Sequence, residues 1–469
     1  MASLATHNVA TESIDSVPPK AAHSSEAREL LKLAAPLALV FAGNQMLSVV
    51  DTAMVGRLGA TELAGVSLGG GLFFAVTVLG MGAVQGMDPL VSQAIGAGEG
   101  ARARAVLKAG LRLAVACGFG LMGFAALSPL LLPSIGVDAE TSRQAFRFVL
   151  ARLPGLIPFL AVMAFRSYLQ SRDFSRPIVI SMIVANLVNF AGNGLLIFGD
   201  GALHKMGLPG MGLPALGVVG SGLASSLAAI VQLAIVWRGL SVLRPADGEG
   251  DVSVIARDVL RVGWPIALTF LAEVGAFTIA GLLAGRIGPS ATAGHQVAIT
   301  IASVTFCVSL GISAATTVRV GRAVGRGDAP GARRAGFVGL GTSLGYMALC
   351  AVGFAVFAGP IARVLSDRPE VLASAIPLVQ IAAFFQLSDG LQCTAAGALR
   401  GIGDTRFIQW ANIFGHYVVG LPLAVALAFG AHLAERGLWW GLSAGLTAVA
   451  IPLVWRFHVK SRGPLARLA

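Results

Sequence analysis

The stretch "VGRLGATELAG" (residues 55–65) reappears as "AGRIGPSATAG" (284–294), 229 residues further along the chain. The stretch "QAIGAGEGARARAVLKAG" (93–110) returns at the same distance as "RAVGRGDAPGARRAGFVG" (322–339). A weaker third pair begins at "LQSRDFSR" (169–176) and returns 230 residues later. Three matches at nearly one distance predict that the chain consists of two related halves.

The composition is that of a membrane protein. Of the 469 residues, 55% are hydrophobic and only 12% are charged, and the mean hydropathy is +0.78. Soluble domains average about 25% charged residues. Apolar runs of about 20 residues, long enough to cross a bilayer, recur along the chain. They predict an all-α polytopic protein with twelve transmembrane helices, near 30–55, 64–91, 106–133, 148–170, 177–199, 215–237, 259–285, 291–318, 335–362, 372–399, 407–430 and 437–456.

The distribution of basic residues predicts how these spans are oriented. If the N-terminus is cytoplasmic and the loops alternate, the cytoplasmic side holds 25 of the 34 Lys and Arg residues and the outer side holds nine. The positive-inside rule then places both termini in the cytoplasm, and we expect a bacterial inner (plasma) membrane. The basic run at 319–334 is a topology signal beside anionic lipid, so the net charge of +11 does not indicate nucleic-acid binding.

Two halves of six spans each enter the membrane in the same orientation, because six is even. Such parallel repeats are typical of transporters in which the substrate binds between two bundles that rock against each other. Transport by alternating access is therefore the function that this arrangement favours. The predicted organisation is a disordered cytoplasmic tail (1–27), an N-terminal six-helix lobe (28–240), a cytoplasmic linker (241–257), a C-terminal six-helix lobe (258–458) and a cytoplasmic C-terminal tail (459–469).

Carboxylates isolated within apolar spans are the strongest candidates for a functional site. Glu273 is the only charged residue between Val262 and Ala284, and Asp389 also lies deep in a span. A charge at a helix centre costs roughly 2.5–3.5 kcal/mol on insertion scales, so such residues usually face an interior cavity. Two carboxylates supply hard oxygens that suit Na⁺, which makes Glu273 and Asp389 a hypothetical metal-ion site. Desolvation would also favour binding of a proton.

Asp51 in the first span is a third candidate for binding or coupling a cation. Asn189 and Asn193 are its candidate neighbours, since residues four apart share one helix face. Asparagine is costly against lipid, although it also serves as a hydrogen-bonding contact between helices. The alternative for Asp51 is a structural partnership, for which Arg57 lies six residues later.

Three further polar residues are weaker candidates. Asp88 precedes Pro89, where local hydrogen bonding is at least as good an explanation as function. His295 and His416 fit either a proton relay or hydrogen bonds between packed helices. The four cysteines all lie within spans, in no CxxC or Cys/His spacing, so they predict neither a disulfide nor a metal cluster. We expect no cofactor.

Taken together, five segments resemble the NorM-type branch of the multidrug and toxic compound extrusion (MATE) family. They are "VDTAMVGRLGATELAGVSLG" (50–69), "LVSQAIGAGE" (90–99), "TAGHQVAI" (292–299), "VRVGRAVGRGD" (318–328) and "AAGALRGIGDT" (395–405). The resemblance implies a V-shaped protein with a central cleft. It also implies an antiporter, not an enzyme, that exports amphipathic and often cationic drugs in exchange for Na⁺ or H⁺. The expected partners are small organic substrates and the lipid bilayer, and we expect a monomer.

The resemblance also assigns roles to individual residues. Glu273 and Asp389 match the family's acidic cation site, and Asp51 matches the acidic residue of the N-terminal lobe, with Asn189 and Asn193 at its polar positions. One position departs from the pattern. A tyrosine can stand four residues before the C-terminal-lobe aspartate in NorM-type sequences, and here that residue is Phe385.

Two alternatives compete with drug export. Relatives that flip lipid-linked or polysaccharide precursors generally line their cavity with basic residues, whereas no Lys or Arg lies near the centre of a predicted span here. An intramembrane aspartyl protease is the more remote alternative, because "GIGD" (401–404) matches the GxGD pattern. The expected partner of such an aspartate is an Asp preceded by Tyr, and none of the three tyrosines precedes an Asp.

Overall fold

The computed structural model describes residues 19–201, 210, 212–241 and 252–468. These residues form helices and connecting loops without a β-strand. Twelve of the helical segments are long and apolar enough to cross a membrane, which confirms the predicted fold class.

The first six spans comprise α1 (Pro19–Val55), α2 and α3 (Ala60–Gln85 and Met87–Gly96), α4 (Gly100–Leu127), α5 and α6 (Ala139–Arg152 and Leu156–Gln170), α7 (Arg176–Phe198) and α9 (Val218–Ser241). The last six comprise α10 (Val252–Ile287), α11 (Pro289–Gly325), α12 (Ala329–Arg363), α13 (Pro369–Gly401), α14 and α15 with the π-helical turns η4 and η5 (Thr405–Gly430), and α16 (Ala434–Lys460). Short 3₁₀ turns follow α4, at Ser128–Leu131 and Pro133–Ile135, and join α5 to α6 at Leu153–Gly155.

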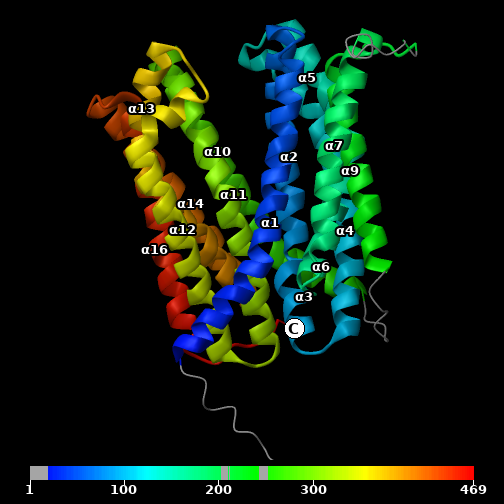
Figure 1. Cartoon of the computed structure of the whole chain (residues 1–469), viewed down its shortest axis with the longest axis vertical. Helices are drawn as coiled ribbons and strands as arrows, with labels where there is room; N and C mark the ends of the chain where they lie inside the picture. The colour runs from blue at the N-terminus through cyan, green and yellow to red at the C-terminus, as the bar shows by residue number, and fades with distance from the viewer. Residues whose placement is uncertain (1–18, 202–209, 211, 242–251, 469) are drawn as a thin grey trace, which may run out of the picture.

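The helices form two bundles that stand apart at the top of the view and meet at the bottom (Figure 1). One bundle contains α2 to α9 and the other α10 to α16. Helix α1 packs against α7 of the first bundle and against α11 of the second, and α10 packs against α2. We call the end where α1 begins and residues 461–468 lie the termini end, and the opposite end the far end.

Small residues let the two bundles approach closely. A Cβ atom on Gly82 of α2 would overlap the backbone of Ala267 on α10. One on Gly311 of α11 would lie 2.6 Å from the backbone nitrogen of Ala38 on α1. Such close helix crossings are typical of membrane proteins, in which helices associate through van der Waals packing rather than hydrophobic burial.

The repeat has a direct structural counterpart at the termini end. The Gln93 amide nitrogen donates a hydrogen bond of 2.9 Å to the Gly401 carbonyl, and the Arg322 guanidinium donates one of 3.0 Å to the Ser171 carbonyl. Gln93 corresponds to Arg322 in the repeat, and Ser171 corresponds to Gly401. The two bonds are therefore the same contact made twice, once in each direction between the halves.

The C-terminal tail joins the halves at the same end. The tail crosses from α16 to α3 (Figure 1). The Leu468 amide donates 2.8 Å to Gln93 Oε1, and Arg102 donates 3.0 Å to the Leu468 carbonyl. Arg467 forms an ion pair of 3.3 Å with Glu99. These contacts tie the last residues of the second half to the first half.

Two of the predicted domain boundaries lie near the start of α1 and in the segment that joins the two halves. The tail was predicted to be disordered up to residue 27, and α1 begins at Pro19. Helix-favouring residues such as Glu26 and Arg28 continue the helix, and Glu26 is anchored by Arg319 at 2.5 Å. Most of the predicted linker, residues 242–251, lies outside the described residues, as does the start of the predicted tail, residues 1–18.

Candidate functional site

Asp51 lies in α1 and is buried in the first half. Asn189 and Asn193 of α7 each donate a hydrogen bond to Asp51 Oδ1, at 2.9 and 2.7 Å. Ser225 of α9 donates to Oδ2 at 2.6 Å. The two asparagines predicted as neighbours of Asp51 are therefore in contact with it, and three helices are joined at this carboxylate.

A basic residue that sequence reasoning missed completes the environment of Asp51. Arg152, the last residue of α5, places Nη1 3.6 Å from Asp51 Oδ2. Its guanidinium also lies over the rings of Phe73 and Phe148, at 5.2 and 5.6 Å from their centroids. Arg57, the partner considered from sequence, forms no ion pair with Asp51 among the described residues. The only signal for Arg152 was an arginine just inside the fourth predicted span.

Glu273 of α10 and Asp389 of α13 lie in the second half, close enough for their carboxyl groups to repel each other electrostatically. Asp389 is 5% exposed, and Glu273 is partly buried. Neither forms an ion pair within 4 Å with a basic residue in the part of the chain that the structure describes. Two neighbouring acids within spans, without a direct counter-charge, are an arrangement that attracts a small cation.

A neutral oxygen atom is available near these two acids. The Gln392 side chain, three residues after Asp389 on α13, lies near Glu273. Its Oε1 atom is buried and has no hydrogen-bond partner among the described residues. Within the described chain no group of three or more His, Cys, Asp and Glu side chains could hold a metal ion. A Na⁺ ion would therefore need amide or hydroxyl oxygens in addition to Glu273 and Asp389.

Aromatic rings cover the two acids on the side of the far end. Phe277, one helical turn after Glu273, meets Phe385, one turn before Asp389, with centroids 6.0 Å apart in an edge-to-face contact. Phe385, the residue that departs from the family pattern, also packs on Trp439 at 5.5 Å. The His416 ring lies 6.1 Å from that of Phe277. Phe385 thus contributes a ring in an apolar cover, where a tyrosine would add a hydroxyl.

The two histidines differ in their surroundings. His295 accepts a hydrogen bond of 3.2 Å at Nδ1 from Trp439 Nε1, which matches the helix-packing alternative. His416 lies in the π-helical turn Phe414–Gly420, and both of its ring nitrogens are buried without a partner in the part of the chain that the structure describes. π-Helical turns are often found at functional positions in helices.

Asp88 lies in the first turn of α3, just after the break at Gly86. It is 6% exposed and is close enough to Arg166 of α6 for electrostatic attraction, although the two form no ion pair within 4 Å. Asp88 Oδ1, Arg166 Nε and the Ser167 hydroxyl are all buried without a hydrogen-bond partner among the described residues. Buried polar atoms of this kind are usually satisfied by water or by a partner that arrives in another conformation.

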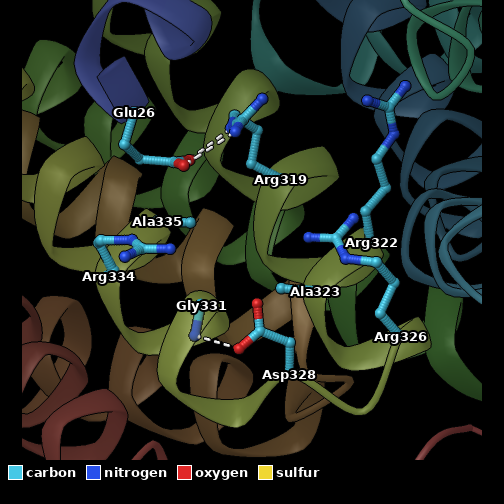
Figure 2. A pocket seen from close by; sticks show the side chains of 9 residues that line it. All are labelled: Glu26, Arg319, Arg322, Ala323, Arg326, Asp328, Gly331, Arg334 and Ala335. Carbon is cyan, nitrogen blue, oxygen red and sulfur yellow. Dashed lines mark hydrogen bonds and ion pairs between the residues drawn. The ribbon is translucent and has the colours of Figure 1, made fainter. Parts of the chain in front are cut away.

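A separate polar pocket lies at the termini end (Figure 2). Arg319 pairs with Glu26 there, and Asp328 accepts a hydrogen bond of 2.7 Å from the Gly331 amide at the start of α12. The pocket joins α1 to the α11–α12 corner, and its basic lining does not suit an organic cation. Its residues are Glu26, Arg319, Arg322, Ala323, Arg326, Asp328, Gly331, Arg334 and Ala335.

Asp404, the aspartate on which the protease alternative rests, forms salt bridges. It pairs with Arg456 and Lys460 of α16, at 2.9 Å in each case, at the termini end. No second aspartate faces it in these contacts. The GxGD match therefore corresponds to a salt-bridged corner between α13 and α14.

The decisive observation on identity is a match in each half of the chain. The family model described as MatE matches residues 36–195 and 265–426, and the two starts differ by the same 229 residues as the repeat. Together they cover more than half of the protein. The chain belongs to the MATE family. It is accordingly a multi-pass membrane transporter and not an enzyme, which removes the protease alternative.

Curated relatives agree with this MATE assignment and confirm the predicted NorM-type branch. The "Probable multidrug resistance protein NorM" of Deinococcus radiodurans is 35% identical over 95% of this chain and 98% of its own length. The "Multidrug resistance protein NorM" of Burkholderia vietnamiensis is 33% identical over 94% and 96%.

Solved MATE structures have the same fold. The eukaryotic transporter AtDTX14 matches with a TM-score of 0.81 at 21% identity, over 94% of this chain and 98% of that one. A point mutant of the Vibrio cholerae transporter VcmN matches with a TM-score of 0.82 at 18% identity, over 94% and 98%.

Proposed function

We propose that this MATE protein exports amphipathic, mainly cationic organic compounds in exchange for Na⁺ or H⁺, by alternating access between its two lobes. The observation that carries the proposal is the acidic pair Glu273 and Asp389, which has no salt-bridge partner within 4 Å among the described residues. Gln392, near Glu273, supplies a further oxygen atom that has no hydrogen-bond partner among the described residues. The pair is thus the binding site that we propose for the coupling ion.

Ion binding must favour one conformation over another if it is to drive transport, because equal affinity for both shifts nothing. Without an ion, Glu273 and Asp389 repel each other and hold α10 and α13 apart. With a cation between them, the two helices are drawn together. An inward-moving charge gains roughly 2.3 kcal/mol per 100 mV of membrane potential, which is enough to work against a substantial substrate gradient.

In the N-terminal lobe we assign Asp51 to coupling or to substrate release. Its three hydrogen-bond donors come from α7 and α9 and its ion-pair partner from α5, so protonation or cation binding at Asp51 would weaken contacts between α1 and these helices together. The Arg152 guanidinium lies beside the carboxylate as its counter-charge. Asp51 is thereby suited to respond when a cationic substrate or ion competes with Arg152.

The orientation follows from the charge distribution. The termini end carries the basic loops and the pocket of Figure 2, and we assign it to the cytoplasm of an inner membrane. The contacts that join the lobes lie at that end, and in the proposed orientation we interpret them as closing the protein toward the cytoplasm. In this state substrate would leave toward the outside.

The substrate class rests on charge and on the names of relatives. The relatives named NorM are described as multidrug resistance proteins. Arg152, Arg166 and Arg400 lie within spans, but each of them has an acidic residue nearby, so they do not form a basic surface for an anionic precursor. A flippase is therefore the less favoured alternative.

The test is ethidium efflux from proteoliposomes with Na⁺ and pH gradients imposed separately. We expect efflux to follow one of the two gradients and to stop when that gradient is dissipated by an ionophore. Reconstituted, correctly folded protein that moves neither ethidium nor a fluoroquinolone under either gradient would contradict export of these compounds and favour the flippase.

A further inference from the structure

Arg400 lies on the same helix as Asp389 and points back toward it. The two residues are eleven positions apart, about three helical turns, and therefore share one face of α13. Arg400 Nε lies 3.4 Å from the carbonyl of Ala396, one turn nearer to Asp389. The side chain thus runs along its own helix toward the acidic pair.

Two hydrogen bonds hold the guanidinium group of Arg400 in place. Arg400 Nη2 donates 3.2 Å to the Ser313 hydroxyl of α11, and Ser313 donates 2.7 Å to the Cys393 carbonyl. Nη1 donates 3.1 Å to Gln85 Oε1, at the end of α2 in the other lobe. The guanidinium is therefore held at the level of residues 393–396 and is bound to both lobes.

The charges that face Arg400 come from both lobes. Glu273 of the second lobe and Asp88 of the first lobe lie close enough to attract it, and Arg166 of the first lobe lies close enough to repel it. Asp389 belongs to the set as the neighbour of Glu273, so three carboxylates supply three negative charges, and Arg400 and Arg166 supply two positive charges. If all five are ionised, one negative charge remains in this largely buried set. Such a set of charges is stable only when it is close to neutral.

We propose that Arg400 is the permanent counter-cation of the Glu273–Asp389 pair, so that a single monovalent ion completes the neutralisation of the site. The inference rests on the proposed antiport and extends it to the number of coupling ions. Arg400 acts as a positioning residue through its charge and does not replace the ion. Its bond to Gln85 gives the ion site a direct connection to the helix break in the other lobe.

Removal of Arg400 should change ion binding in a defined direction. Without it, the site holds two uncompensated negative charges, so an incoming cation is bound more tightly and a second ion is required for neutrality. In Arg400→Gln we expect the half-saturating ion concentration for ethidium efflux to fall about tenfold or more. Arg400→Lys keeps the charge and loses the fork of hydrogen bonds, and it should remain close to wild type in this measurement.

The experiment measures ethidium efflux in proteoliposomes as a function of the coupling ion, together with the ion-to-ethidium ratio at the gradient where net flux vanishes. The double variant Arg400→Gln with Asp88→Asn removes one charge of each sign, so its half-saturating concentration of the coupling ion should return toward that of wild type. Ser313→Ala is the control that removes one bond to Arg400 and no charge. If Arg400→Gln does not reconstitute, Arg400→Met takes its place with the same expectation.

The results separate the two proposals. A wild type whose efflux depends on neither ion contradicts the antiport, and the role of Arg400 with it. If wild-type efflux depends on an ion but Arg400→Gln has an unchanged half-saturating ion concentration and ion-to-ethidium ratio, only the role of Arg400 is contradicted. A shift in Arg400→Lys or Ser313→Ala as large as that in Arg400→Gln would also overturn it, because the effect would then come from packing rather than charge.

Discussion

Arg152 Nη1 lies 3.6 Å from Asp51 Oδ2, and this contact changes how Asp51 is understood. The carboxylate is not an isolated charge in the membrane but one half of a largely buried pair, and it also accepts three hydrogen bonds. A role in coupling then requires that Asp51 exchange partners during the cycle. A purely structural role requires only that the pair persist.

The variant Asp51→Asn separates these roles. It keeps the shape of the side chain but leaves the partly buried Arg152 without its counter-charge, so we expect a loss of about 1–3 kcal/mol of stability and of most ion-driven efflux. Adding Arg152→Met removes the uncompensated charge and should recover much of the thermal stability without recovering efflux. Melting and ethidium efflux measured on the same preparations test this. Full efflux in Asp51→Asn would assign Asp51 a structural role.

The two symmetric bonds at the termini end should control how readily the lobes part there. Arg322→Met removes the bonds to the Ser171 carbonyl and to Asp173. Losing such charge-assisted bonds costs about 1.5–3 kcal/mol, which should raise the population open at this end by about tenfold or more. Labelling of a single cysteine introduced between the lobes at this end measures the change. Arg326→Met on the same corner is the control, and equal labelling in the two variants would contradict the prediction.

Close packing at Gly82 predicts a steric effect on stability. In Gly82→Ala the new methyl group meets the backbone of Ala267, which cannot move without separating α2 from α10. We expect a loss of about 1–3 kcal/mol, measured as a lower melting temperature in detergent. A Cβ atom on Gly71 of the same helix would meet nothing within 4 Å, so Gly71→Ala should be neutral or slightly stabilising. Similar melting in both variants would argue against the close crossing.

Topology gives a prediction that does not depend on transport. We expect cysteines placed in the 238–258 segment and after residue 460 to react with a membrane-impermeant reagent only in inverted vesicles, because the proposed orientation places both on the cytoplasmic side. A cysteine at position 136, at the far end, should react only in intact cells. Reaction of the 238–258 segment from outside would overturn both the orientation and the parallel repeat.

Much of the fold could be predicted from sequence because span length, repeat distance and charge asymmetry are local or periodic properties. Asn189 and Asn193 could be assigned to Asp51 because they share a helix face, even though 138 residues separate Asn189 from Asp51. Arg152 and Arg400 could not be assigned, because the carboxylate that pairs with Arg152 and the groups that hydrogen-bond to the Arg400 guanidinium lie on other helices, and the sequence places each arginine near the end of a span. There an arginine is equally well explained as a topology signal.

The aromatic cover over the acids could not be predicted for a similar reason. Phe277 and Phe385 are ordinary members of apolar spans in the sequence, and only the tertiary arrangement of α10 and α13 brings their ring centroids to 6.0 Å. The termini-end contacts of Leu468 depend on a chain segment without periodic pattern. Its position follows from tertiary contacts alone.

The central claim is that Glu273 and Asp389 bind the coupling ion. Ion-driven ethidium efflux in proteoliposomes, compared among wild type, Glu273→Gln, Asp389→Asn and the exposed control Glu140→Gln, tests it most directly. We predict that the control transports normally and that both site variants lose ion-driven efflux. Both should melt no lower than wild type, because a neutral side chain costs less to bury. Normal efflux in both site variants under the same gradients would contradict the claim and leave Glu273 as a hydrogen-bonded support between helices.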